Sequence, residues 1–84
     1  DEAVVRDADL AVLAAPDDEF DRYDAAIRLE YAAVPYDEYR AGRSRVLRSF
    51  LGRPTIYFTS GMRPLEGAAR RNMGRALDRL DIGF

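Results

Sequence analysis

The stretch DDEFDRYDAAIRLEYAAV, residues 17–34, decides the fold class of this chain. Its large apolar side chains recur at spacings of 3, 4, 4 and 3 residues, at Phe20, Tyr23, Ile27, Tyr31 and Val34. That spacing places them on one face of a helix, whereas the opposite face carries charged side chains. The stretch therefore predicts an amphipathic helix from about Asp18 to Ala33, which Pro35 ends.

Three further helices are predicted on either side of this one. The segment from about Glu2 to Ala14 is apolar nearly all round, which is typical of a helix buried on most faces. A third helix, capped by Asp37, ends at Gly52 and Pro54, because glycine and proline commonly follow a helix C-terminus. The last helix keeps helical spacing of its apolar residues, which are Leu65, Ala69, Met73, Ala76 and Leu80.

Between the third and last helices lies the only strand-like run, Thr55–Phe58, which we interpret as a short strand or an extended connector. Thr59 or Ser60 can cap the helix that follows. The chain is thus predicted to be all-α, with about four helices in one segment, residues 1–84. Because three neighbours could not cover the apolar first helix, we expect it to pack against something outside this chain.

The composition of the 84 residues excludes several kinds of chemistry. The chain contains no Cys and no His. This removes disulfides, thiol nucleophiles, imidazole bases and the common zinc sites. No apolar run approaches the roughly 20 residues of a membrane helix, so no membrane partner is expected. The lack of a targeting segment and of cysteine makes the cytoplasm the expected location.

The two halves of the chain carry opposite charge. Residues 1–42 hold twelve Asp and Glu against four Arg, and residues 43–84 hold nine Arg against three Asp and Glu. One interpretation is that acidic and basic helices lie side by side and neutralise each other. The other is a basic face for phosphate or nucleic acid. Nucleic acid is not the partner we expect, because the whole chain has a net charge of −2.

Two carboxylates, Asp7 and Asp9, interrupt the apolar first helix. A carboxylate in such a place is costly unless it is paired, hydrogen-bonded or bound to a metal. At positions i and i+2 the two point to different sides of the helix, so only one can face a given site. A salt bridge to an arginine of the basic half and a bond to a hard divalent cation both remain possible interpretations.

A resemblance to a known family covers nearly the whole chain. The residues that carry it are Arg6 to Pro16 with its Asp-Ala-Asp-Leu core, Arg28 to Pro35, Tyr39 to Arg43, Val46 to Leu51, Arg53, Ile56-Tyr57, Thr59, Glu66, Ala69-Arg70 and Asn72-Met73. Together and in this order they resemble the C-terminal half of a bacterial branch of the HD superfamily, described as predicted metal-dependent phosphohydrolases.

The resemblance implies an HD-type helical fold that lacks its N-terminal helices and binds a divalent metal ion. In that family a His, a His-Asp pair and a later Asp hold the metal. Asp9 matches the later Asp, with Asp7 as the second candidate, and Arg40 and Arg43 are candidates for holding substrate phosphate. Since this chain has no His, the other ligands would come from a missing N-terminal segment of the same protein, and the chain alone would be inactive.

Two hypotheses of different classes follow. In the first, the chain is the C-terminal fragment of a metal-dependent phosphohydrolase that acts on a phosphate-containing small molecule. In the second, it is a non-catalytic helical module that uses its apolar first helix for protein interaction or homo-oligomerisation. The first predicts negligible metal affinity of the isolated chain, and the second predicts a stable oligomer with Asp9 in an ion pair.

Overall fold

Four α-helices and two short 3-10 helices make up the computed structural model, which describes residues 2–82 and the side chains of residues 5–81. They are α1 (Glu2–Asp9), η1 (Ala11–Ala14), α2 (Asp17–Glu30), α3 (Tyr36–Leu51), η2 (Ser60–Leu65) and α4 (Glu66–Ile82). No strand occurs in this range, so the predicted all-α class with about four helices is confirmed and Thr55–Phe58 is a connecting loop.

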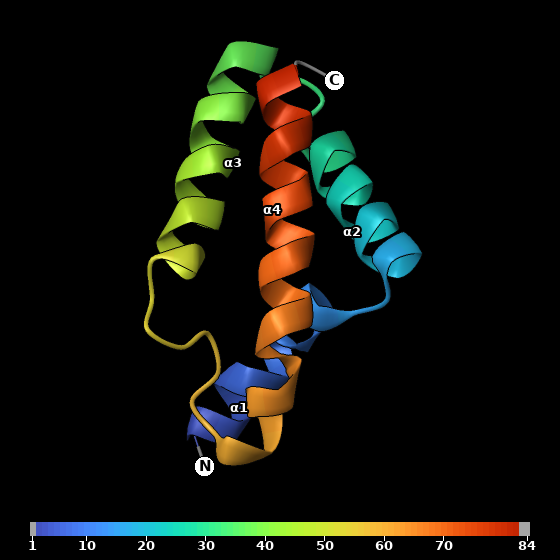
Figure 1. Cartoon of the computed structure of the whole chain (residues 1–84). Helices are drawn as coiled ribbons and strands as arrows, with labels where there is room; N and C mark the ends of the chain where they lie inside the picture. The colour runs from blue at the N-terminus through green and yellow to red at the C-terminus, as the bar shows by residue number, and fades with distance from the viewer. Residues whose placement is uncertain (1, 83–84) are drawn as a thin grey trace.

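The helix α4 forms the axis of the fold (Figure 1). α2 and α3 lie on either side of it, and α1, η1 and η2 gather around its N-terminal end. The described part is elongated, with extents of 38 × 22 × 22 Å. No helix in it is both long and apolar enough to cross a membrane.

The hydrophobic core follows α4 on the side that faces its neighbours. Its buried members are Leu13, Phe20, Tyr39, Leu47, Ile56, Tyr57, Ala69, Met73, Ala76 and Leu80. The last four are the stripe predicted for the final helix, whereas Leu65, at the end of η2, is 36% exposed. Of the apolar stripe of α2, Phe20 is fully buried and Tyr31 is half exposed.

The first helix ends earlier than predicted, at Asp9 rather than at Ala14. Hydrogen bonds from distant side chains explain the change. The Tyr57 hydroxyl donates to the Leu10 carbonyl (3.0 Å), and Asn72 Nδ2 donates to the carbonyls of Leu13 (2.9 Å) and Ala15 (2.8 Å). The backbone between them tightens into η1, with 3-10 bonds such as Leu13 N–H to Leu10 O.

The other helix ends also differ in detail from the sequence prediction. Pro35 is the N-cap of α3 and Asp37 lies in its first turn, so the predicted Asp37 cap is wrong. Thr59 is the N-cap of η2 and Ser60 is its first residue, so neither caps α4, which begins at Glu66. At the end of α2, Arg28 Nη1 donates to the Tyr31 carbonyl (3.0 Å), and the helix stops at Glu30.

Gly52 follows α3 as predicted, but not in a left-handed conformation. Its φ is −76°, so its lack of a side chain is not what ends the helix. Arg70 of α4 instead reaches the end of α3, where its guanidinium donates to the carbonyls of Leu51 and Arg53, both at 2.9 Å. These bonds satisfy acceptors that a helix C-terminus leaves open.

Candidate functional site

The two carboxylates of α1 lie in opposite environments. The Asp7 side chain is buried, with 1% of the residue exposed, whereas Asp9 is exposed. Residues two apart on a helix point roughly 200° apart, as expected from the sequence. The fold therefore gives Asp7 and Asp9 different surroundings.

Asp7 binds the loop that precedes η2. Its Oδ1 accepts the Phe58 N–H at 2.8 Å, and its Oδ2 accepts the Thr59 N–H at 2.7 Å and the Thr59 hydroxyl at 2.6 Å. The sequence left an ion pair or a metal open for this carboxylate. Its buried surroundings contain three uncharged donors, which satisfy most of its hydrogen-bonding capacity.

These donors determine the charge state of Asp7. Burial alone would raise the pKa of the Asp7 carboxyl, but hydrogen bonds from the Thr59 hydroxyl and from the N–H groups of Phe58 and Thr59 outweigh burial and lower it. Asp7 is therefore ionised at neutral pH although it lies inside the fold.

Glu66 also accepts hydrogen bonds from backbone N–H groups of this loop. Its Oε1 accepts the N–H groups of Ile56 (2.7 Å) and Tyr57 (2.8 Å). Two carboxylates thus take four consecutive backbone donors, residues 56–59, which explains why a run with strand-like residues forms no strand. Burial, together with the nearby charges of Glu66 and Asp7, raises the pKa of Tyr57 to about 12.

Asp9 remains available on the other side of α1. It makes no hydrogen bond or ion pair within the part of the chain that the structure describes. Val5, one helical turn earlier on the same side, is 59% exposed. This side of α1 therefore presents an apolar side chain next to a free carboxylate.

A metal site would need more ligands than this surface supplies. Among the residues described, no group of three or more Asp, Glu, His or Cys side chains could hold a metal ion. Asp9 fits a hard cation as a single oxygen ligand, and Asp7 fits one poorly because its oxygens are already occupied. Any metal held here would need further ligands from another polypeptide segment.

Arg40 and Arg43 lie far from Asp9 in the fold. Arg40 pairs with Asp81 (3.7 Å) near the end of α4, and α1 lies beside the beginning of α4, about 25 Å away along this helix (Figure 1). Arg43 donates from Nε (3.3 Å) and Nη2 (3.0 Å) to Asp24, and its side chain is only 10% exposed. The fold therefore does not bring these arginines to the carboxylate of Asp9.

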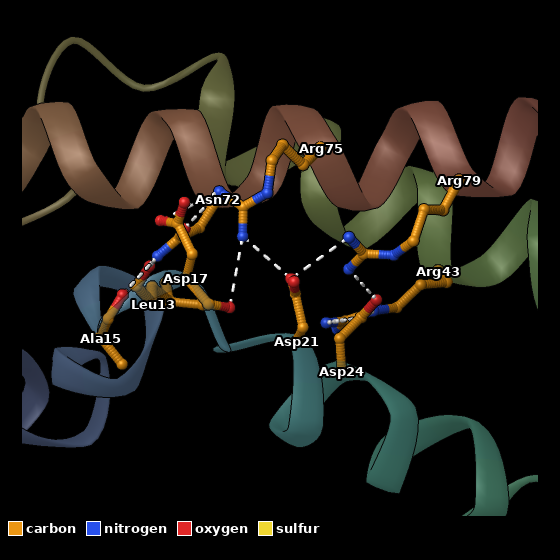
Figure 2. A network of polar contacts seen from close by, with 9 residues as sticks. All are labelled: Leu13, Ala15, Asp17, Asp21, Asp24, Arg43, Asn72, Arg75 and Arg79. Carbon is orange, nitrogen blue, oxygen red and sulfur yellow. Dashed lines mark hydrogen bonds and ion pairs between the residues drawn. The ribbon is translucent and has the colours of Figure 1, made fainter. Parts of the chain in front are cut away.

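A ladder of ion pairs joins the acidic helix α2 to the basic residues of α3 and α4 (Figure 2). Asp21 accepts from Arg75 (2.9 Å) and Arg79 (3.2 Å). Asp24 accepts from Arg79 (2.8 Å) and Arg43 (3.0 Å). The hydrogen bond from Arg75 lowers the pKa of Asp21, and the charges of Arg79 and Arg75 add to this against the effect of burial. The two charged halves of the chain therefore neutralise each other, as the first interpretation of the charge pattern predicted.

Asn72 connects this ladder to η1 (Figure 2). Its Nδ2 donates to the carbonyls of Leu13 and Ala15, while its Oδ1 accepts from Arg75 at 2.7 Å. The sequence pattern predicted no role for Asn72 or Glu66, because an isolated polar residue on a helix carries no periodic signal. It favoured a solvated Arg70 on the polar side of the last helix, whereas Arg70 donates to the carbonyls of Leu51 and Arg53. The one available clue was that Asn72 falls on the apolar face of the last helix, three residues after Ala69 and four before Ala76.

Comparisons of this chain with known protein families, with curated proteins and with solved structures found no match.

Proposed function

We propose that this chain supplies the later aspartate of an HD-type metal-dependent phosphohydrolase site, with Asp9 as the ligand. The observation that supports this most directly is the division of roles within α1. Asp7 is occupied by Phe58 and Thr59, whereas Asp9 is free, exposed and adjacent to exposed Val5. A surface of this kind is what a neighbouring segment carrying the remaining ligands would cover.

In this proposal the residues of the chain position a ligand and do not perform the reaction alone. Asp7 anchors α1 to the loop before η2, and this anchor holds the Asp9 carboxylate at a defined place. A divalent metal ion bound there would polarise a phosphoryl oxygen and lower the pKa of a bound water. The resemblance assigns the other ligands to a preceding segment with a His and a His-Asp pair.

The first test identifies the polypeptide in which this sequence occurs. Intact-mass and peptide mass spectrometry of the protein from its natural source should find a longer chain with a His…His-Asp stretch before Asp1. A single natural species of 9.5 kDa that begins at Asp1 would contradict the proposal.

The second test measures bound metal in that longer polypeptide. Asp9→Asn should lower its divalent metal content and its hydrolysis of p-nitrophenyl phosphate, each by about tenfold or more, because loss of even a supporting residue weakens metal sites to this extent. The 84-residue chain alone should bind no stoichiometric Mn²⁺. Asp37→Asn makes the same chemical change at an exposed carboxylate in the first turn of α3 and serves as the control, since it should leave the metal content unchanged. Unchanged metal content in Asp9→Asn would overturn the proposal.

The alternative function, a non-catalytic helical interaction module, is favoured by the exposure of Val5 on an otherwise well-anchored helix. It predicts that a Val5→Glu variant loses self-association. It also predicts that Asp9→Asn removes one ion pair at the interface and leaves the metal content unchanged. Within one described chain Asp9 makes no ion pair, so this hypothesis needs a second chain to supply the arginine.

A further inference from the structure

A second surface of the chain, remote from α1, has no role in the proposed metal site. It is a groove of about 850 Å³ between α2 and α3. Its lining comes from these two helices and the turn between them, and includes no residue of α4. In Figure 1, α2 and α3 lie on either side of α4.

Apolar side chains in this groove remain in contact with solvent. Tyr31 is 52% exposed on one wall and Val46 is 45% exposed on the other. The Tyr31 ring lies 6.2 Å from the ring of Tyr39, which is buried below it. Two of the large exposed apolar residues of the described chain thus share one concave surface, a distribution typical of interaction sites.

Gly42 lies in the middle of α3, where it lines the groove. A glycine weakens a helix interior relative to alanine. No part of the described chain requires one here, since an added Cβ would meet no atom within 4 Å. The open space above Gly42 would allow another helix to approach the α3 backbone closely.

The groove carries one acidic and one basic side chain that could pair with those of a second copy. Glu38 and Arg45 both line it, both are exposed, and neither forms an ion pair within the described chain. They lie seven residues apart on one face of α3, with Gly42 between them. In an antiparallel pair of α3 helices centred near Gly42, Glu38 of each copy would lie beside Arg45 of the other.

We propose that the α2–α3 groove is the interface of a homodimer, in which α3 of a second copy lies antiparallel across Gly42. The interface is isologous, so each Glu38–Arg45 contact occurs twice. Pairing the two α2–α3 hairpins gives a four-helix arrangement that covers Tyr31 and Val46 in both copies. This proposal uses no residue of α1, so it can fail or hold independently of the proposed function.

Sedimentation equilibrium of the 84-residue chain tests the interface, with circular dichroism as the measure of folding. The chain should dimerise, and Gly42→Leu should raise the dimer dissociation constant by about tenfold or more while the helical signal is kept. Gly74→Leu is the matched control, because Gly74 is also a helical glycine with no atom within 4 Å of an added Cβ. It should leave the dissociation constant unchanged.

Charge reversal tests the antiparallel register. E38R and R45E should each weaken the dimer by about tenfold, because each places like charges opposite one another. The double variant E38R/R45E should recover dimerisation, since the reversed charges pair again across the interface. A chain that stays monomeric at about 0.5 mM would overturn the proposal, because even a weak dimer with a Kd of about 1 mM would be partly populated there. A dimer insensitive to Gly42→Leu and to both reversals would overturn it as well.

Discussion

Asp7 and Asp9 lie two residues apart in α1. Because their surroundings differ, substitution of each should affect the stability of the fold differently. Asp7 accepts two backbone N–H groups and a hydroxyl, whereas Asp9 is exposed and free. A carboxylate that satisfies buried backbone donors is difficult to replace, because an amide offers one acceptor oxygen in place of two.

Asp7→Asn should therefore lower the melting temperature clearly, by several degrees, since one of the donors from Phe58 and Thr59 would face an NH₂ group. Asp9→Asn, with the same chemical change at an exposed site, should alter the free energy of unfolding by no more than about 0.5 kcal/mol. Thermal unfolding followed by circular dichroism measures both. Equal shifts in the two variants would contradict the assigned role of Asp7.

The buried hydroxyl of Tyr57 should make the fold sensitive to alkaline pH. Its pKa is about 12 in the folded chain, against about 10 in an unfolded one. A raised folded pKa means that the stabilisation is fully present below pH 10 and is lost as the pH rises through 12. Denaturant unfolding between pH 8 and pH 12 measures this loss.

Tyr57→Phe is the matched variant for this alkaline effect. It should flatten the decrease in stability between pH 10 and pH 12, because no phenol remains to ionise. At neutral pH it should cost only about 1 kcal/mol, the typical value of the lost hydrogen bond to Leu10. An alkaline decrease that is as steep in Tyr57→Phe as in the natural chain would exclude Tyr57 as its source.

At the scale of the elements, helix existence and helix boundaries have different origins. The apolar spacing of α2 and α4 is local, and it predicted the existence of these helices correctly. The ends depend on distant side chains, as when Asn72 takes the carbonyls of Leu13 and Ala15 and turns the end of the first helix into η1.

The end of α3 gives a test of this dependence. Arg70→Met keeps the length of the side chain but removes its bonds to the carbonyls of Leu51 and Arg53, and should cost about 1 kcal/mol because Arg70 is partly exposed. Hydrogen exchange should also quicken in the last turn of α3. The control is Arg71→Met at the neighbouring exposed position, which should change neither the free energy of unfolding nor the exchange rate in α3. If Arg71→Met had the same effect as Arg70→Met, the cause would be the lost charge and not the lost hydrogen bonds.

At the scale of the whole molecule, the charged halves of the chain hold the three long helices together. The central contacts of the ladder have little solvent access, since the side chains of Arg43 and Asp24 are 10% and 16% exposed. The Arg22–Asp18 pair within α2 is instead 71% and 78% exposed. Burial of this kind separates ion pairs that stabilise a fold from those that contribute little.

A double-mutant cycle with Arg43→Met and Asp24→Asn should give a coupling free energy of about 1–3 kcal/mol. The same cycle on Arg22 and Asp18 should give no more than about 0.5 kcal/mol, because solvent screens that pair. Urea unfolding measures each variant. Equal coupling in the two cycles would mean that the ladder is an incidental surface feature.

The ladder should also make the fold sensitive to acid. The pKa of Asp21 is lowered in the folded chain, first by its hydrogen bond from Arg75, so its stabilising contribution is present above about pH 4 and is lost as the pH falls further. Asp7 acts in the same direction. Unfolding curves between pH 2 and pH 6 should show this loss, and Asp21→Asn should make it shallower.

The sequence alone determined that the chain is all-α and roughly where its helices lie, because helical periodicity, prolines and glycines act over a few neighbouring residues. It also indicated that Asp7 and Asp9 diverge, which follows from helix geometry. Only the tertiary structure decided which carboxylate is buried, where the first helix stops and how the opposite charges pair. Each of these depends on contacts between residues some 20 to 60 positions apart, such as Asp7 with Thr59 and Arg75 with Asp21, and local sequence does not encode such distances.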